Sequence, residues 1–352
     1  MTESDSAPLV AAAPLGEDDL AAYNALRTDA VWWDSTIHWS SFRGEKAADA
    51  LNGLVTNDVA ALGTGEGLHA AALSPKGKLV TDMLIIRLDE TALLIATMPG
   101  AAPAWMDLAR KYVNPRLCKV ADETDRYHSW MVYGAQAPRA IAAIGGASAL
   151  DPLARDGMIT ALTEWPTWRH GSWSLGPVSI RLIRAPIMGA VPGFIILADV
   201  ADAPFVQQRF ADAPFRQGSR AVWNVARIEA GRPVIGIDMD ENTIPQEANL
   251  DSLGAISFTK GCYTGQETVA RVHFRGHVNR HLRGLIGDAP LVAGARVTDA
   301  SDKVVGDVRS AVISPSRGSI AMAMVRREVE VGATVSAGGV AARVVSLPFP
   351  SV

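Results

Sequence analysis

The sequence predicts an α+β protein that ends in a small antiparallel β-barrel. Helix and strand patterns alternate over residues 17–283, but without the regular strand–helix repeat of a parallel α/β fold. From residue 284 to 352, short valine-rich strands recur with glycines between them, which is typical of a barrel or sandwich. The chain has 352 residues, 48% of them hydrophobic, which is enough for two or three domains with substantial cores.

Three helices and a strand meander are expected in the first third of the chain. Residues 16–30 carry acidic residues in the first turn of an amphipathic pattern, which favours a helix, and residues 45–59 show a similar pattern. Residues 68–97 are interpreted as three strands joined by two turns. A third helix is predicted over residues 100–113.

The middle of the chain is expected to be richer in strands. Residues 128–145 are interpreted as one strand running into another, and the glycine- and alanine-rich stretch 144–157 as a loop. Residues 177–199 return to strands. Residues 220–233 predict a helix that a glycine and a proline close.

Composition favours a cytoplasmic protein. The formal net charge of −4 excludes a polycation that coats nucleic acid along its whole length. Only two cysteines are present, Cys118 and Cys262, too few for a disulfide framework. No apolar run approaches the ~18 residues that a membrane helix needs, so no membrane contact is expected. Residues 1–16 lack the pattern of a signal peptide and are expected to form a disordered tail.

One cysteine lies in an unusual setting, within the stretch KGCYTGQE at residues 260–267. Thr264 and Glu267 have the spacing of a capping box, which predicts a helix that starts at Gly265. Cys262 would then precede a helix N-terminus, where partial positive charge favours the nucleophilic thiolate. Lys260 adds a full positive charge two residues away.

A plainer interpretation of Cys262 is equally open at this point. Free cysteines are among the most buried residue types, so this one could simply pack beneath a helix cap. Cys118 has no comparable neighbours, and we assign it to packing.

A basic run follows the cysteine. Residues 260–283 hold five lysines or arginines and a single acid, which predicts an anionic partner such as a carboxylate-tailed cofactor, a phosphate or RNA. A solvated helix face explains the run equally well. The same segment contains His273, His277 and His281, but no paired cysteines accompany them, so we assign no metal site.

Two acids occupy apolar surroundings. Asp82 starts an apolar strand, and Glu229 lies near the end of an apolar helix, where a carboxylate opposes the helix dipole. Each either pairs with a cation, such as Arg227 or Arg232, or hydrogen-bonds a ligand.

The motif KGCYTGQE, extended as FTKGCYTGQETVARVHFRG, resembles the signature of the YgfZ family of folate-binding proteins, whose eukaryotic relatives act in mitochondrial iron–sulfur cluster maturation. The stretches WWDSTIHW, LVTNDVAAL, SPKGKLVTDMLI and RIEAGRPVIG are similar to the wider superfamily of the glycine-cleavage T-protein, a tetrahydrofolate-dependent aminomethyltransferase. The resemblance covers roughly residues 17–350. It implies a three-part fold around a central hole that holds folate, with the C-terminal barrel closing one side.

The resemblance also implies roles for single residues. Glu229 stands where the T-protein glutamate hydrogen-bonds the pterin ring. Asp82 matches one of two adjacent aspartates in the transferase pattern, while Thr81 replaces the other. This departure argues against aminomethyl transfer, so whether the chain is an enzyme is left open.

The expected function is that of a folate-binding accessory protein that assists iron–sulfur cluster synthesis or repair through Cys262. Two alternatives remain: a folate-dependent aminomethyl- or methyltransferase, and a module that docks tRNA or a protein on the basic run. The cofactor in the first two cases is tetrahydrofolate or a one-carbon derivative, and the expected protein partners are iron–sulfur clients or assembly proteins. The candidate catalytic residues are Cys262, Lys260 and Asp82, and the candidate folate contacts are Glu229, Arg227, Asp82, Tyr263, Gln266 and Arg275.

Overall fold

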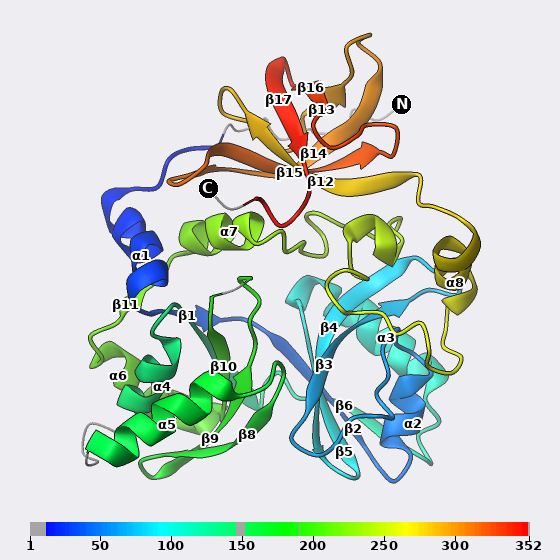
Figure 1. Cartoon of the computed structure of the whole chain (residues 1–352). Helices are drawn as coiled ribbons and strands as arrows, with labels where there is room; N and C mark the ends of the chain where they lie inside the picture. Colours follow the sequence, from blue (N-terminus) through cyan, green and yellow to red (C-terminus); the bar gives the residue numbers. More distant parts are fainter. Residues whose placement is uncertain (1–11, 146–151, 190, 351–352) are drawn as a thin grey trace.

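The computed structural model describes residues 12–145, 152–189 and 191–350. Two sheet-containing lobes lie side by side, and a closed barrel covers one end of both (Figure 1). The predicted α+β class and the C-terminal antiparallel barrel are therefore confirmed. Most of the predicted tail, residues 1–11, lies outside the described residues.

The first lobe is a five-stranded sheet in the order β3-β4-β5-β2-β6. Phe42 and Trp105 stack in its core with ring centroids 5.8 Å apart, and Cys118 is buried in the same cluster, as predicted. Its elements are β2 (His38–Arg43), α2 (Ala47–Asn52), β3 (Gly67–Leu73), β4 (Leu79–Asp89), β5 (Ala92–Thr97), the short 3-10 helix η1 (Pro99–Ala101), α3 (Ala102–Tyr112) and β6 (Lys119–Asp122). The expected meander over residues 68–97 is β3, β4 and β5.

The second lobe is a six-stranded sheet in the order β11-β1-β7-β10-β9-β8, with helices against one face. It contains β1 (Val31–Ser35), β7 (Tyr127–Tyr133), α4 (Ala137–Ile144), α5 (Pro152–Glu164), β8 (His170–Leu175), β9 (Val178–Arg184), β10 (Gly193–Asp199), η3 (Val200–Asp202), α6 (Ala203–Ala211) and β11 (Arg216–Gln217).

Three local predictions were wrong. Residues 128–145 form one strand and then helix α4, whose second residue is Pro138; proline fits the first turn of a helix, where its missing N–H costs nothing. The predicted loop 144–157 is contradicted over its last residues by helix α5, which starts at Pro152 and buries Leu162 against the sheet, while residues 146–151 lie outside the described residues. The helix expected over residues 45–59 ends at Asn52.

The two sheets pack face to face between the lobes. Trp39, Leu84 and Ile86 from the first sheet are buried against Ile183 and Ile195 from the second. The inner faces of β4 and β10 are therefore apolar along most of their length, and this interface forms the floor of the space beneath the barrel.

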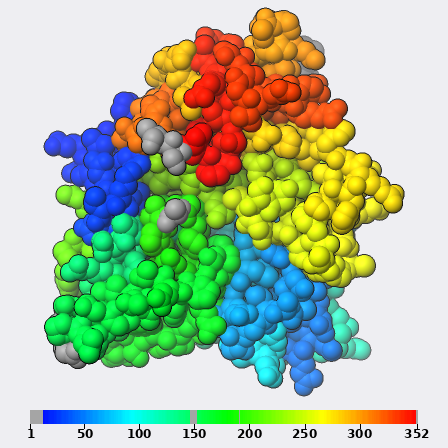
Figure 2. Space-filling model, viewed as in Figure 1, coloured from blue at the N-terminus to red at the C-terminus, as the bar shows by residue number. Residues whose placement is uncertain are grey.

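Two helices lie between the lobes and the barrel. Helix α7 (Arg220–Glu229) runs directly under the barrel, and α1 (Glu17–Thr28) packs beside it (Figure 1). The chain then passes through η4 (Pro245–Ala248) and α8 (Gln266–Arg275) along the first lobe. The segment that includes α8 forms a yellow flank below the barrel in the space-filling view (Figure 2).

The barrel closes through the strand order β12-β15-β14-β13-β16-β17. Its strands are β12 (Arg280–Gly287), β13 (Arg296–Thr298), β14 (Val304–Ser314), β15 (Gly318–Arg326), β16 (Thr334–Ala337) and β17 (Val340–Val345). The first strand begins at Arg280, slightly before the predicted boundary at residue 284. Across the ranges that the structure describes, no helix is both long and apolar enough to cross a membrane.

Candidate functional site in the central cavity

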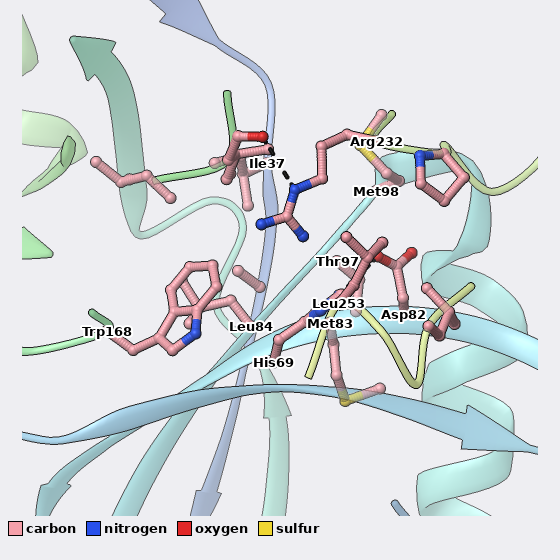
Figure 3. Close-up of a pocket in the computed structure, with 15 residues that line it drawn as sticks. Ile37, His69, Asp82, Met83, Leu84, Thr97, Met98, Trp168, Arg232 and Leu253 are labelled. Carbon is pink, nitrogen blue, oxygen red and sulfur yellow. Dashed lines mark hydrogen bonds and ion pairs between the residues drawn. The ribbon is translucent and has the colours of Figure 1, made fainter. Parts of the chain in front are cut away.

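A cavity of about 150 Å³ opens where the two sheets meet the chain that follows α7. Its wall is mostly apolar, with residues from both sheets and from the segment around Leu250 and Leu253. Few polar side chains line it, among them His69, Asp82 and Arg232 (Figure 3). An apolar cavity with a few convergent polar groups is the usual form of a small-molecule site.

Asp82 and His69 are brought together by the β3–β4 hairpin. In its register Ala71 pairs with Asp82 and His69 pairs with Leu84, so the two polar side chains are diagonal neighbours on one face. His69 Nε2 lies 3.0 Å from Asp82 Oδ2. The other ring nitrogen, Nδ1, is buried and has no hydrogen-bond partner among the described residues. His69 therefore lines the cavity with one ring nitrogen bound to Asp82 and the other buried without a partner.

Trp168 and Arg232 complete the polar end of the cavity. Trp168 has a φ of 65°, a left-handed conformation that is strained for a bulky residue, and its ring centroid lies 6.2 Å from that of His69. Arg232 Nε donates to the carbonyl of Ile187 at 3.0 Å, and burial lowers the pKa of its guanidinium. The charge of Asp82 acts in the opposite direction. The cavity thus offers a carboxylate acceptor and a guanidinium donor to the same ligand.

Thr81 faces away from this cavity. Its side chain is fully buried, and its hydroxyl donates to the carbonyl of Asp82 at 2.7 Å. Thr81, the residue that departs from the transferase pattern, therefore lies on the face of β4 opposite to the cavity. Asp82, the acid that the pattern retains, lines the cavity.

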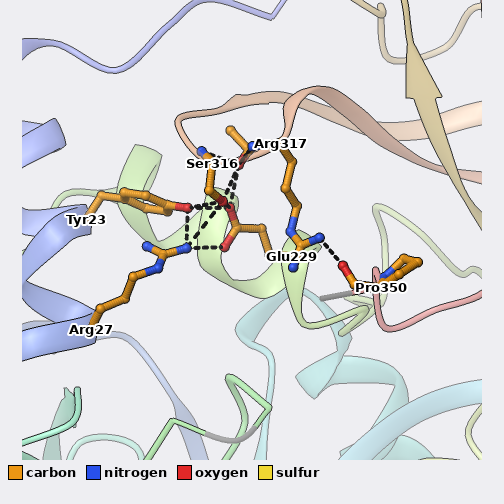
Figure 4. Close-up of polar contacts among 7 residues, drawn as sticks. Tyr23, Arg27, Glu229, Ser316, Arg317 and Pro350 are labelled. Atoms are coloured by element: carbon orange, nitrogen blue, oxygen red, sulfur yellow. Dashed lines mark hydrogen bonds and ion pairs between the residues drawn. The ribbon is translucent and has the colours of Figure 1, made fainter. Parts of the chain in front are cut away.

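Glu229 lies at a different place, at the junction of α1, α7 and the barrel (Figure 4). Its Oε1 accepts from the Tyr23 hydroxyl at 2.6 Å and from Ser314 Oγ at 2.5 Å, and Arg27 lies 3.5 Å from Oε2. It borders a separate cavity together with Arg27 and Arg317. The expected contact between Glu229 and a pterin stays a prediction, and these partners give the carboxylate a role in joining three elements.

Arg227 is buried within a hydrogen-bond network. Its guanidinium binds Asp238 Oδ2 at 2.7 Å and Ser310 Oγ at 2.9 Å, and both partners are buried. The ion pair ties α7 to the segment that follows it, and the hydrogen bond to Ser310 ties α7 to strand β14. Of the six candidate folate contacts, only Asp82 lines the cavity between the sheets.

The cysteine motif packs against the turn of the same β3–β4 hairpin that carries Asp82. Gly265 has a φ of 80°, and a Cβ there would lie 2.6 Å from the Ser74 carbonyl oxygen. A Cβ on Gly77 would lie 2.5 Å from Thr268 Cβ. Thr268 Oγ1 also donates to the Lys76 carbonyl at 3.1 Å. Both glycines are required for this close approach.

The predicted capping box was wrong, although the helix was predicted correctly. Helix α8 spans Gln266–Arg275, and its N-cap is Gly265, without a side-chain cap. Thr264 instead contributes its backbone N–H and hydroxyl to the Gly53 carbonyl, at 3.0 and 3.4 Å. The left-handed glycine turns the chain so that the Thr264 side chain faces α2 rather than the helix end.

Lys260 anchors the loop that presents Cys262. Its Nζ donates to the carbonyls of Asn52, the last residue of α2, and of Val55 and Asn57 just beyond it, at 2.6, 2.8 and 2.9 Å. Burial lowers its pKa to about 8. Its three donors are therefore directed at backbone oxygens, while Cys262 is exposed. The influence of Lys260 and of the helix on the thiol stays a prediction.

The remaining motif residues lie around this loop. Tyr263 is buried, its ring lies 5.1 Å from Lys260 Nζ, and burial raises the pKa of its hydroxyl to about 12. Gln266 is half-buried at the first position of α8, and Arg275 is exposed at its last.

Sequence reasoning missed His69 and Trp168. The hairpin register holds a signal for His69, since a turn near residue 75 places it diagonal to Asp82. No sequence pattern indicates the conformation of Trp168.

The fold and this cavity define a class of protein, the glycine-cleavage T-protein-like proteins. Residues 18–260 match the GCVT N-terminal domain, and residues 280–350 match the glycine cleavage T-protein C-terminal barrel domain. The crystal structure of glycine cleavage system aminomethyltransferase T from Bartonella henselae superposes with a TM-score of 0.81 over 97% of this chain and 91% of that one, at 22% identity.

Two relatives narrow the class. A tRNA-modifying protein YgfZ from Enterobacter sp. (strain 638) is 32% identical over 260 residues, which cover 73% of this chain and 71% of the relative. One from Yersinia enterocolitica is 30% identical over 241 residues, 68% of this chain and 65% of the relative. The chain belongs to the YgfZ family, as its cysteine motif indicated.

Proposed function

We propose that this protein binds a reduced folate in the cavity that Asp82 lines and acts as an accessory factor in tRNA modification. The observation that supports the proposal is the polar end of the cavity, where Asp82, His69 and Arg232 line an otherwise apolar space. A pterin ring carries N–H donors for Asp82 and acceptors for Arg232. Its flat face suits the apolar wall and the Trp168 ring.

The residues present therefore fit the pterin ring of a tetrahydrofolate. Asp82 would hold the pterin N–H groups, and His69 would keep the carboxylate oriented through its 3.0 Å contact. Bound tetrahydrofolate supplies the nitrogens that carry a one-carbon unit.

The accessory role would depend on the thiol of Cys262. The thiol is exposed, and the loop that presents it is fixed by Lys260 and by two glycine contacts. The resemblance implies a role in iron–sulfur cluster maturation, whereas the relatives are named tRNA-modifying proteins. Both descriptions apply if the client is an iron–sulfur enzyme that modifies tRNA. A single thiolate is too few to hold a stable cluster, since such sites usually need about four protein ligands.

A second candidate function, one-carbon transfer, is favoured by one observation. Thr81 faces away from the cavity, so the acid that lines it is intact. Turnover of a one-carbon donor by the folate-loaded protein, abolished in Asp82→Asn, would favour this function over the accessory role.

The folate site is tested with two acid-to-amide variants, Asp82→Asn and Glu229→Gln. If the cavity between the sheets binds the pterin, Asp82→Asn weakens tetrahydrofolate binding by about 1.5–3 kcal/mol, the scale of a hydrogen bond to a charged group. Calorimetry measures the affinity. Glu229→Gln should leave it within about twofold, because its partners are Tyr23 and Ser314. A loss confined to Glu229→Gln would move the site to the other cavity.

The thiol is tested by labelling and by replacement. Cys262 is exposed, whereas Cys118 is buried with a raised thiol pKa, so a mild alkylating reagent should label Cys262 first in the native protein. Cys262→Ser should keep the folate affinity but fail to restore tRNA modification in a null strain, and Cys118→Ser should restore it. Full complementation by Cys262→Ser would contradict the role of the thiol.

A further inference from the structure

Another, strongly polar pocket lies between α8, the start of the barrel and the turn that follows η4. Its volume is about 360 Å³. Three of the chain's seven histidines line it, His273, His277 and His281, together with Arg283. The described residues include no group of three or more histidines, cysteines or acids placed to hold a metal ion, so this histidine cluster has to be explained in another way.

Gln246 shows that the pocket is built for a ligand with a hydrogen-bond donor. Its side chain is only 6% exposed, and its Nε2 donates to the Val269 carbonyl at 2.8 Å. Its Oε1 is buried and has no partner among the described residues. Because a buried unpaired acceptor costs about 1–3 kcal/mol, a ligand N–H at this oxygen would be favourable.

Arg283 provides the opposite chemistry. Its guanidinium forms no hydrogen bond or ion pair with any residue that the structure describes, and partial burial lowers its pKa. Asp251 lines the same pocket. A carboxylate, an unpaired amide oxygen and a free guanidinium together suit a ligand that carries both negative charge and N–H donors, more than they suit a bare anion.

Aromatic rings flank the pocket. The His273 ring stacks on Phe258 with centroids 3.6 Å apart, and Phe274 stands edge-on to His273. Phe274 is 68% exposed, an unusual setting for a phenyl ring. Arg271 and Arg275 are exposed on the same helix. Exposed rings interleaved with cations are the features by which proteins hold single-stranded nucleic acid, through stacking and phosphate contacts.

We propose that this pocket accepts one unstacked nucleotide of a single-stranded RNA segment. Arg283 and His277 contact the phosphate, Gln246 Oε1 accepts from an amino or imino N–H of the base, and Phe274 stacks on the neighbouring base. The proposal rests on the proposed function, since it supplies the RNA-binding site that an accessory factor in tRNA modification would use.

The test uses three variants of the full chain and a fluorescein-labelled, unstructured RNA of about ten nucleotides, a length in the range of single-strand sites. Fluorescence anisotropy at low salt gives the affinity. Phe274→Ala should weaken binding at least about fivefold through lost stacking. Arg283→Gln should weaken it similarly and reduce the slope of log affinity against log salt by about one. Arg110→Gln removes an exposed arginine on α3 and should leave binding within about twofold.

Equal RNA affinity for Phe274→Ala, Arg283→Gln and Arg110→Gln would overturn the proposal. So would an Arg283→Gln variant that keeps RNA affinity but binds polyglutamated tetrahydrofolate less tightly than the wild type, because the pocket would then hold a folate tail. The Asp82→Asn variant separates the two proposals. Its affinity for monoglutamyl tetrahydrofolate tests the folate site in the cavity between the sheets. Its affinity for RNA should equal that of the wild type, because Asp82 lies outside the pocket beside α8.

Discussion

His170 is a buried residue whose two ring nitrogens are both engaged in the neutral form. Arg181 donates to Nδ1 at 3.0 Å, and Nε2 lies 3.0 Å from the Arg87 carbonyl, which assigns the proton to Nε2. Protonation would place a second N–H against a guanidinium. Burial and this neighbour lower the pKa to about 4.

This residue predicts acid sensitivity. The folded pKa of about 4 lies below the 6.5 of an unperturbed histidine, so between these values the unfolded chain binds more protons and stability falls as the pH falls. The loss should reach about 3 kcal/mol near pH 4, from 1.36 kcal/mol per pKa unit. His170→Gln, which can keep both contacts, should remove this part of the pH dependence in urea unfolding. Parallel pH profiles for the two proteins would contradict the assignment.

Single residues also show where sequence reasoning reached its limit. Asp82 stood out because an acid in an apolar strand needs a partner. The partner itself, His69, lies across a hairpin. Glu229 stood out for the same reason, yet its hydrogen-bond donor Tyr23 is 206 residues away in the chain. A sequence shows that a buried carboxylate needs partners but does not say which distant residues supply them.

At the scale of elements, helix α7 is joined to the segment that follows it by a buried ion pair, and to strand β14 of the barrel by a hydrogen bond from Arg227 to Ser310. Arg227 and Asp238 are 2.7 Å apart, with side chains 4% and 0% exposed. Asp238 also accepts from the Val234 N–H at 2.9 Å. Removing one partner of such a pair leaves a buried charge uncompensated.

Asp238→Asn should therefore lower the free energy of unfolding by about 3–5 kcal/mol. Asp240→Asn is the matched control, because Asp240 pairs with Arg309 at 3.2 Å while still 32% exposed, and its loss should cost about 1 kcal/mol or less. Urea unfolding of both variants measures the difference. Equal stability of the two would show that Arg227 finds other partners.

Helices and strands were predicted correctly where apolar residues recur at a regular spacing, and wrongly where apolar residues form a continuous run. The meander β3–β5 and helices α1, α3 and α7 follow clear patterns. The run that forms α4 is almost wholly apolar, and a buried helix and a buried strand then look alike. The proline at the second position of α4 was the available signal.

At the scale of the whole molecule, the class of fold and the barrel followed from pattern and spacing, and the arrangement of three parts followed from the resemblance. Neither the sequence pattern nor the resemblance showed which side chains contact one another. The candidate folate contacts are divided among the cavity between the sheets, the α7 junction and the α8 flank. Residues that stand close together in a motif, such as Arg227 and Glu229, point to different neighbours because successive helical positions face different directions.

The close contact between Gly77 and the cysteine motif also has a consequence for biosynthesis. Gly77 leaves the ribosome 188 residues before Gly265 does, and at about 5–20 residues per second this delay is roughly ten to forty seconds. During that interval Ala71, Leu73 and Leu79, which are buried against residues 239–269 in the finished protein, have no cover. The nascent first lobe therefore exposes these apolar side chains near the hairpin turn until the residues up to the cysteine motif arrive to cover them.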